Sequence, residues 1–121
     1  MSDLKKLGPQ GEAHAWELLK KRGDKLVARN FTCPLGELDL VTWHKETLVF
    51  TEVRARSSLA FGSPAETVTK RKQEKIKRAA NRFCLQMFKG KPLPACRFDM
   101  IWILARDGKI VDSGIIEGAF C

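Results

Sequence analysis

Two short acidic segments carry the side chains of this sequence that are best suited to chemistry. Residues 36–39 read Gly-Glu-Leu-Asp, and residues 52–54 read Glu-Val-Arg. Each segment lies in an apolar stretch typical of a β-strand, and the short turn between the stretches predicts a β-hairpin. In a hairpin with a tight central turn, Asp39 lies directly opposite Glu52. Opposed carboxylates about 5 Å apart repel each other, so we expect Asp39 and Glu52 to bind a divalent metal ion.

The register of this hairpin decides whether the two carboxylates meet. Side chains alternate along a strand, so Glu37 shares a face with Asp39, and Glu52 shares a face with Arg54. The same register puts Glu37 opposite Arg54, where Glu37 would form a cross-strand ion pair or an accessory metal contact. The turn lacks the Gly or Asn that two-residue primed turns prefer. A bulge there would shift the register by one residue and put the carboxylates on opposite faces.

The composition favours a polyanionic partner. The 121 residues include 22 Lys and Arg against 14 Asp and Glu, which gives a net charge of +8 and an isoelectric point near 9.6. An excess of this size favours nucleic acid ahead of an anionic membrane surface. The length predicts a single domain over residues 1–121, with enough chain for a hydrophobic core.

Several classes of protein are excluded by what the sequence lacks. It has no run of 18 apolar residues, so we expect no transmembrane helix and no membrane partner. Its first eight residues have no long apolar segment, so we expect no signal peptide and a cytoplasmic location. The four cysteines have no C-x-x-C spacing and there are two histidines, which argues against a zinc finger and for free thiols.

The elements that position the acidic segments follow from hydrophobic periodicity and from Gly and Pro positions. A near-continuous apolar stretch at 98–104 is typical of a strand covered on both faces. The order of elements is αβββαββ, which predicts a small α/β domain with a central mixed β-sheet flanked by helices. We expect helices at 9–22 and 69–88, strands at 25–31, 37–43, 48–54, 95–104 and 109–116, and an irregular segment at 55–68.

The first predicted helix carries a carboxylate in line with its buried face. Trp16 and Leu19 form the apolar stripe, and Glu12 continues that stripe one turn earlier. Glu12 would either belong to the metal site or stabilise the helix as a first-turn acid. Both interpretations stay open from the sequence.

The second predicted helix is strongly basic. Between residues 69 and 91, Glu74 stands alone among many lysines and arginines, and Thr69 is the expected N-cap. The free N–H groups of a helix start, together with several cations, would bind phosphate. The alternative is a solvated cationic face. The residues that we expect to contact nucleic acid are Arg54, Arg56, Lys70, Lys72, Gln73 and Lys75.

Several motifs follow one another along the chain: Gly11-Glu12, the segments at 36–41, 48–54 and 61–65, Lys72-Gln73, the segment at 97–100, and Ala119-Phe120. In this ordered set the chain resembles the YraN-like family of small bacterial proteins over nearly its whole length. That family is similar to archaeal Holliday-junction resolvases and belongs with the restriction-endonuclease-like superfamily, whose signature is PD-(D/E)-x-K.

The resemblance implies a nuclease that uses Mg²⁺ or Mn²⁺ on structured or branched DNA. Carried over by position, the signature aspartate is Asp39, the (D/E)-x-K element is residues 52–54, and the helix-borne glutamate of the resolvases is Glu12. The backbone carbonyl of Val53 would be a third oxygen ligand, as is common in this superfamily. Oxygen ligands of this kind suit a hard cation that hydrolyses phosphodiesters. The resemblance also implies DNA ahead of RNA, and a homodimer would match the two-fold symmetry of a junction.

Arg54 departs from the superfamily signature, which has lysine at this position. An arginine binds phosphate in a bidentate way, but its pKa is too high for a general base. Water activation would then depend on the metal, or Lys72 would substitute from the helix. Three functions therefore stay open: a metal-dependent endonuclease, a non-catalytic nucleic-acid-binding module on a nuclease fold, and an interaction subunit of a DNA-processing complex.

A few other side chains carry expectations that the structure can test. We expect Asp99 to pair with an arginine, and Arg97 shares its strand face. Phe61, in the irregular segment, is the aromatic side chain that we expect to touch substrate. We also expect exposed positions for His14 and His44 and core positions for Trp16, Trp43 and Trp102.

Overall fold

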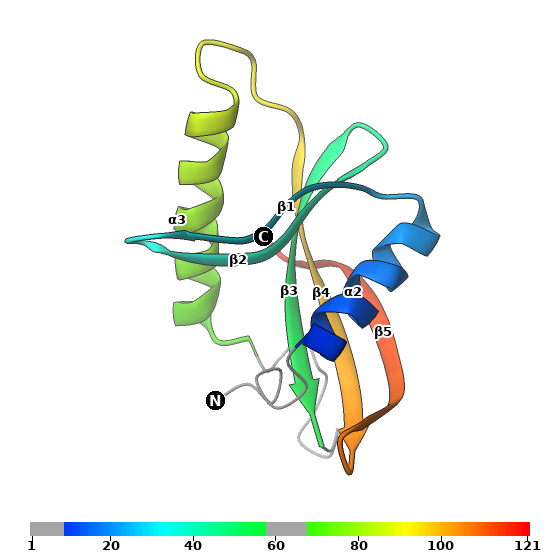
Figure 1. The fold of residues 1–121 in the computed structure, drawn as a ribbon. Helices are drawn as coiled ribbons and strands as arrows, with labels where there is room; N and C mark the ends of the chain where they lie inside the picture. Colours follow the sequence, from blue (N-terminus) through cyan, green and yellow to red (C-terminus); the bar gives the residue numbers. More distant parts are fainter. Residues whose placement is uncertain (1–8, 58–67) are drawn as a thin grey trace.

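The fold places helices against both faces of a single sheet (Figure 1). The computed structural model describes residues 9–57 and 68–121. Within them the elements follow the order αβββαββ, as predicted. Phe61 and the motif at 61–65 lie outside the described residues. The helices are α2 (Pro9–Arg22) and α3 (Lys70–Met87), and the strands are β1 (Lys25–Cys33), β2 (Gly36–His44), β3 (Thr47–Arg56), β4 (Cys96–Arg106) and β5 (Lys109–Phe120).

The five strands lie in the order β1-β2-β3-β4-β5. β3 and β4 run parallel, whereas the other neighbouring strands are antiparallel. The sheet is therefore mixed, as predicted. A parallel pair needs a crossover connection, and α3 lies in the connection from β3 to β4, beside the strands that carry the acidic segments.

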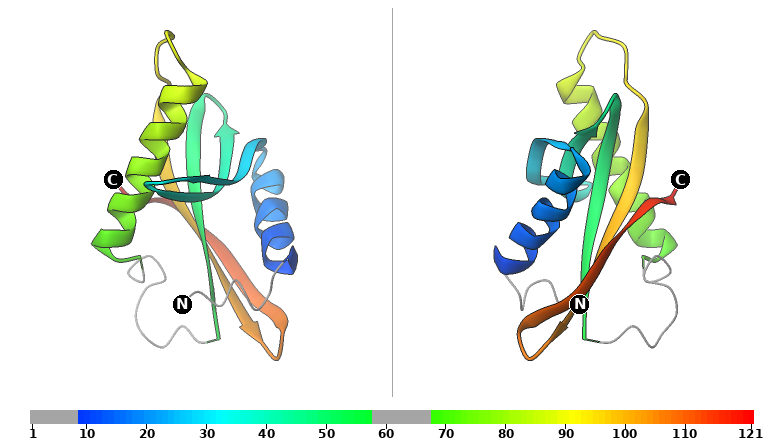
Figure 2. Two further views of the ribbon diagram at one scale, coloured as in Figure 1. Left: turned by 60° about the vertical axis from the view of Figure 1, so that its left-hand side comes forward. Right: turned by 90° about the vertical axis from the view of Figure 1, so that its right-hand side faces the viewer.

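α2 and α3 cover opposite faces of the sheet (Figure 2). On one face Phe50 packs in a core with Ile76 and Phe83 of α3. On the other face Val53 packs in a second core with Leu19 of α2. β3 contributes to both cores, and its residues 48–53 are buried without interruption. The second acidic segment therefore begins inside the longest uninterrupted buried run among the described strands.

The helix ends follow the signals in the sequence. α2 spans the predicted residues and stops at Gly23, whose φ of +100° is a conformation that glycine adopts readily. α3 starts directly after Thr69, which accepts a hydrogen bond from the Lys72 amide and is the predicted N-cap. No helix in the described part of the chain combines the length and hydropathy needed to cross a membrane.

All five strands are longer than predicted, and β3 continues to Arg56, so the predicted irregular segment does not begin at residue 55. The extensions of β1 and β5 lie at their C-terminal ends. β1 continues to Cys33 because it stays paired with β2 as far as Gly36, and β5 continues to Phe120 because it stays paired with β4. The β1–β2 hairpin thereby reaches α3. A Cβ atom at Gly36 would lie 3.0 Å from the backbone carbonyl oxygen of Lys75. Glycine therefore permits this close approach between the start of β2 and the helix.

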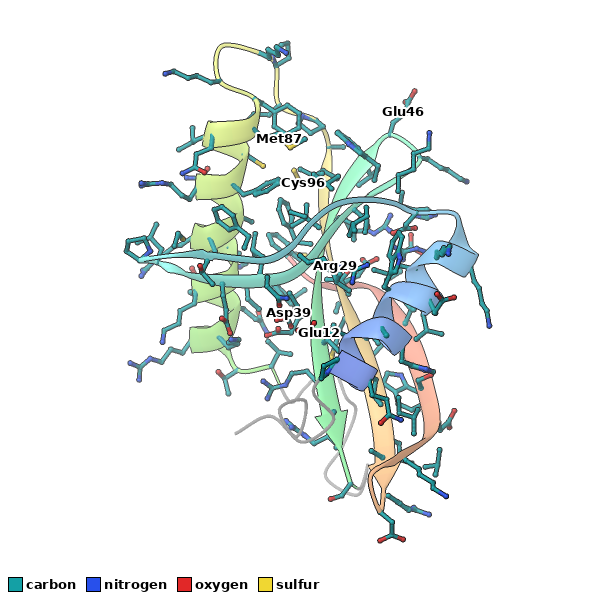
Figure 3. All side chains as sticks on the ribbon, viewed as in Figure 1. Glu12, Arg29, Asp39, Glu46, Met87 and Cys96 are labelled. Atoms are coloured by element: carbon teal, nitrogen blue, oxygen red, sulfur yellow. The ribbon has the colours of Figure 1, made fainter. Side chains whose placement is uncertain are left out.

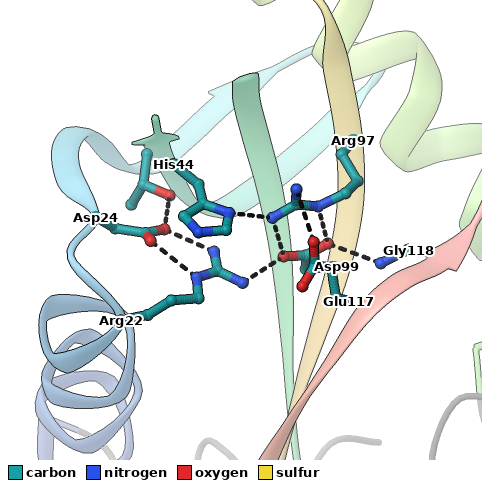
Figure 4. A network of polar contacts seen from close by, with 8 residues as sticks. Arg22, Asp24, His44, Arg97, Asp99, Glu117 and Gly118 are labelled. Carbon is teal, nitrogen blue, oxygen red and sulfur yellow. Dashed lines mark hydrogen bonds and ion pairs between the residues drawn. The ribbon is translucent and has the colours of Figure 1, made fainter. Parts of the chain in front are cut away.

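A network of charged side chains ties the end of α2 to the sheet (Figure 4). Arg22 donates hydrogen bonds to Asp24 and, at 2.7 Å, to Asp99. Asp99 is fully buried and accepts further hydrogen bonds from Arg97 and the Gly118 amide. Burial alone would raise the pKa of Asp99, but these hydrogen bonds outweigh burial and hold that pKa below its ordinary value. The predicted pairing with Arg97 is confirmed, whereas the part played by Arg22 was not predicted.

The prediction that both histidines are exposed is wrong. His44 is half-buried, and its Nδ1 lies 2.8 Å from Nη2 of Arg97. His14 is also half-buried, and its Nε2 lies 2.7 Å from Oγ of Ser113, which joins α2 to β5. These partners are remote in sequence, so local pattern gave no sign of them. The core positions expected for the three tryptophans are confirmed as partly buried packing positions for Trp16, Trp43 and Trp102.

Candidate metal and nucleic-acid site

The hairpin of β2 and β3 has the predicted register. Pairing runs without a bulge from the turn to Leu40 and Thr51. The next residues along the two strands are Asp39 and Glu52. The ladder of paired residues ends here, and the Asp39 carboxylate accepts a hydrogen bond from the Val53 amide at 2.9 Å. Asp39 is thus held against β3 by its own side chain.

Glu52 is a buried acid beside a second carboxylate. Its side chain is 8% exposed, and its Oε2 atom has no hydrogen-bond partner among the residues that the structure describes. Burial, a hydrogen bond shared with Asp39 and repulsion by the Asp39 charge raise the pKa of Glu52 to about 9. The positive charges of Lys72 and Arg54 oppose this rise. An acid in this position holds either a proton or a cation at neutral pH.

Lys72 brings an ammonium group to this acid from α3. Its Nζ atom lies 3.7 Å from Oε2 of Glu52. The first turn of the helix is fixed by hydrogen bonds of its own, from the Lys72 amide to Thr69 and from the Gln73 side chain to the Val68 carbonyl. The Gln73 amide group is therefore engaged at the helix start, and Lys72 is the side chain that reaches the acid.

Asp39 lies between two hollows in the surface. On the side of α2, Asp39 and Val53 line a hollow of about 260 Å³, open to solvent, together with Glu12. Figure 3 shows Glu12 and Asp39 close together beside the first turn of α2. On the side of α3, Asp39 lines a second open hollow of about 170 Å³ with Glu37 and Glu52. The fold therefore gathers around Asp39 the other three carboxylates selected from the sequence.

Arg54 places a second kind of cation at the edge of the site. Burial and the neighbouring charge of Arg56 lower the pKa of Arg54, against the attraction of the two carboxylates. A guanidinium group nevertheless stays protonated in proteins. Glu37 is exposed and pairs with Thr32 of β1, and the predicted pairing of Glu37 with Arg54 lies beyond the end of the β2–β3 ladder.

The start of α3 adds exposed positive charge next to the carboxylates. Lys70, Arg71 and Lys75 are exposed, whereas Lys72 is half-buried. The backbone of Lys75 touches the start of β2 at Gly36. The cations of this turn are therefore anchored to the strand that carries Asp39.

These oxygen donors suit a hard divalent cation. Two carboxylates share the site, and an oxygen of one is buried and has no hydrogen-bond partner within the described part of the chain. Within residues 9–57 and 68–121, no group of three or more His, Cys, Asp or Glu side chains could hold a metal ion. Mg²⁺ is commonly held by one or two carboxylates, with water or phosphate oxygens in the other positions, so a pair is a sufficient donor set. The carbonyl of Val53 stays a predicted ligand.

Two further residues of the site were not singled out from the sequence. Arg29 and Asn30 of β1 line the same hollow as Glu12 and Asp39. The guanidinium carbon of Arg29 lies 5.8 Å from the ring centroid of Trp16, so the arginine also packs against α2. Asn30 has a φ of +49°, a conformation that Asn tolerates better than most residues. A lone Asn in a strand is too weak a signal to predict this position.

The chain has close relatives among known proteins. Residues 11–103 match the model of a family described as uncharacterised protein family UPF0102. A protein from Caldicellulosiruptor saccharolyticus is 40% identical over 117 residues, which cover 96% of this chain and 98% of that protein. Another from Pelotomaculum thermopropionicum is 40% identical over 122 residues, covering 99% and 100%. A third, from Saccharophagus degradans, is 44% identical over 105 residues, covering 87% and 88%. All three carry the name UPF0102 protein, which states no activity.

Proposed function

This chain belongs to the UPF0102 family, and we propose that it is a divalent-metal-dependent endonuclease that hydrolyses phosphodiester bonds in structured or branched DNA. The resemblance to YraN-like proteins is confirmed as membership of that family. The activity is our inference from the geometry of the site and from the resemblance of its motifs to the nuclease signature.

The observation that carries the proposal is the pair of carboxylates Asp39 and Glu52, of which Glu52 is buried and Asp39 is half-buried. Asp39 and Glu52 come from adjacent strands, line one hollow, and lie where Lys72 of α3 reaches Glu52. Burying an acid beside a second carboxylate destabilises a fold unless a proton or a cation accompanies it. A divalent cation that enters from solvent would offset this destabilisation and would give the carboxylates a catalytic role.

The chain's own residues would divide the work of phosphodiester hydrolysis. Asp39 and Glu52 would hold Mg²⁺ or Mn²⁺, which when bound polarises a phosphoryl oxygen and lowers the pKa of water. Glu12, across the hollow from Asp39, would orient the attacking water. Arg54 would place a permanent positive charge beside the phosphate, where it would stabilise the negative charge that develops in the transition state.

The surroundings of the pair support a nucleic-acid substrate. Lys70 and Lys75 are exposed in the first turns of α3, and Arg56 follows Arg54 on β3. The net charge of +8 has the sign that attracts a polyanion. These cations would contact phosphates on either side of the bond to be cut.

Arg54 also favours a second function, a nucleic-acid-binding module or interaction subunit that keeps the nuclease fold without turnover. A guanidinium group cannot remove a proton from water at neutral pH. If activity depends on a base at position 54, the chain binds DNA and does not cut it. The variant Arg54→Lys tests whether activity needs a base at position 54, because it restores the lysine of the superfamily signature.

The proposal is tested by a cleavage assay with Mg²⁺ and with Mn²⁺. Single-stranded, duplex, flap, fork and four-way-junction DNA are incubated with the wild type, Asp39→Ala, Glu52→Gln and Arg54→Lys. We expect the wild type to cut a branched substrate, and we expect both carboxylate variants to lose at least about 100-fold in rate, as removal of an essential catalytic group does.

The remaining outcomes separate the alternatives. Cleavage that survives in Asp39→Ala would locate the activity elsewhere or in a contaminant. Junction binding without cleavage by the wild type, with cleavage gained by Arg54→Lys, would select the binding module. Absence of both binding and cleavage at moderate salt would leave the interaction subunit.

A further inference from the structure

We infer that Lys72 is the resident counter-ion of Glu52 in the metal-free protein and that a divalent cation displaces it. The inference rests on the metal site of the proposed function and adds a residue from α3 that regulates its occupancy. It concerns binding of the metal, and its test therefore does not depend on cleavage.

The geometry of the contact supports a counter-ion held loosely. Nζ of Lys72 lies 3.7 Å from Oε2 of Glu52, which is within ion-pair range but too long for a hydrogen bond. The Oε2 atom is buried and has no hydrogen-bond partner in the described part of the chain. A group that satisfied this oxygen fully would approach more closely. Lys72 therefore lies beside the acid without filling its coordination position.

The side chain of Lys72 is also placed to move. Its exposure is 33%, against 8% for Glu52, so the acid is fixed and the ammonium group has a path to solvent. Its backbone, in contrast, is held by the Thr69 cap. The long stem of lysine can swing away from the pair while the helix stays in place. After displacement, the ammonium group would lie at the mouth of the site, where a phosphate oxygen arrives.

The sign of the effect on metal binding follows from charge alone. With a divalent cation bound, the site around Glu52 is more positive than it is without metal. This holds whether Glu52 is ionised or protonated in the metal-free protein. Repulsion by Lys72 therefore increases on binding. Removing the charge of Lys72 should tighten the binding of a divalent cation, although it also removes a favourable ion pair from the metal-free protein.

Lys77 provides a matched control on the same helix. It has the same exposure as Lys72, 33%, and it forms an ion pair with exposed Glu74 at 3.4 Å. Lys77→Met changes the net charge of the protein by the same amount as Lys72→Met. It differs in that Lys77 has no ion pair with Glu52 among those found in the described residues.

The experiment is a Mn²⁺ titration followed by electron paramagnetic resonance, which counts free Mn²⁺ directly. Wild type, Lys72→Met, Lys77→Met and Glu52→Gln are compared at pH 7.5 and moderate salt, after circular dichroism has shown that each is folded. We expect Lys72→Met to bind Mn²⁺ roughly tenfold more tightly than the wild type, since a nearby unit charge at partial exposure is worth about that factor. Lys77→Met should change the affinity less than about twofold, and Glu52→Gln should lose the site.

The pattern of affinities separates this inference from the proposed function. If Glu52→Gln abolishes Mn²⁺ binding but Lys72→Met binds like the wild type or more weakly, Lys72 is not a displaced counter-ion, and the metal site stands. If Lys77→Met tightens binding as much as Lys72→Met, the effect is one of net charge, and the inference is wrong. If none of the four proteins binds Mn²⁺, both the inference and the metal site of the proposed function are overturned.

Discussion

A buried carboxyl group such as Glu52 links the stability of the protein to pH. Burial and the adjacent Asp39 carboxylate raise the pKa of Glu52 from 4.5 to about 9. The folded protein therefore binds this proton more tightly than the unfolded chain does. Under this condition the free energy of unfolding decreases as the pH rises between the two values. Glu52 should thus oppose folding most strongly above pH 9 and least strongly below pH 4.5.

We predict that Glu52→Gln flattens this dependence. Without divalent metal, the free energy of unfolding of the wild type should fall by up to about 4 kcal/mol between pH 5 and pH 8, because each pH unit between the two pKa values contributes at most about 1.4 kcal/mol. Glutamine has no proton to lose, so the variant should be the more stable protein at pH 8. Urea denaturation in the presence of a metal chelator, repeated at several pH values, measures the free energy of unfolding of the wild type and of the variant. Glu37→Gln, which removes an exposed acid, is the control and should keep the slope of the wild type. If the free energy of unfolding had the same pH dependence in the wild type and in Glu52→Gln, folding would not raise the pKa of Glu52, and the prediction would be wrong.

The sequence carries enough information to pair these two acids but not to describe their surroundings. The hairpin register follows from strand length and a short turn, and it is confirmed from the turn to Leu40 and Thr51. The burial of Glu52 depends on packing by α3, which a strand pattern does not contain. The same holds for Arg29 and Asn30, since β1 comes to line the hollow only through its pairing with β2.

At the scale of the element, α3 has two distinct surfaces. Ile76, Ala80 and Phe83 pack on the sheet. Lys70 and Lys75, in the first turns of the helix, are exposed, and Ile76 of the same helix lines the hollow with Asp39 and Glu52. If nucleic acid binds here, each phosphate neutralised by one of these lysines releases a counterion, and the affinity becomes steeply dependent on salt.

We predict that Lys70→Gln combined with Lys75→Gln weakens DNA binding and lowers its salt dependence. The slope of log Kd against log salt should fall by about 1 to 2, since each phosphate contact contributes about 0.9. Fluorescence anisotropy with a labelled junction measures both quantities over a range of salt concentrations. Arg106→Gln with Lys109→Gln removes the same charge from exposed positions at the β4–β5 turn and should leave the slope unchanged. Equal losses in both double variants would mean that net charge, rather than α3, governs binding.

Helices were easier to predict than strands because their ends carry local signals. Thr69 and Gly23 mark a start and a stop by their own chemistry, and both are confirmed. The ends of β1 and β5 depend on how long the neighbouring strand continues, so both strands are longer than their apolar pattern indicates. The contact of Gly36 with Lys75 was also beyond local pattern, because it depends on the crossing of a hairpin and a helix.

At the scale of the molecule, the network around Asp99 holds the end of α2 to three strands. Asp99 is 0% exposed and shares its charge between Arg22 and Arg97. The outer member of the network is Glu117, whose carboxylate lies 3.0 Å from the Arg97 guanidinium and whose side chain is 58% exposed. Breaking a buried ion pair leaves uncompensated charge inside the fold, whereas an exposed pair contributes little. Arg22 and Asp99 are 77 residues apart in the sequence. Local sequence pattern therefore indicated only the neighbouring Arg97 as a partner of Asp99.

We predict that Asp99→Asn lowers the free energy of unfolding by about 3 kcal/mol, because two arginines lose their common buried carboxylate. Glu117→Gln removes one negative charge from the same network at its exposed end and should cost less than about 1 kcal/mol. Urea denaturation at pH 7 compares the two variants with the wild type. Losses of similar size would show that the buried carboxylate contributes no more than its exposed counterpart.

The hydrogen bond from the Val53 amide to the Asp39 carboxylate has a spectroscopic consequence. Most amides of a central strand report on the backbone of a neighbouring strand, but this one reports on a side chain in the site. Its proton and nitrogen resonances should move when Mg²⁺ withdraws electron density from that carboxylate, even if no substrate is present. Val53 thus provides a built-in nuclear magnetic resonance probe of whether the site is occupied, in the wild-type protein and without any added label at the carboxylates themselves.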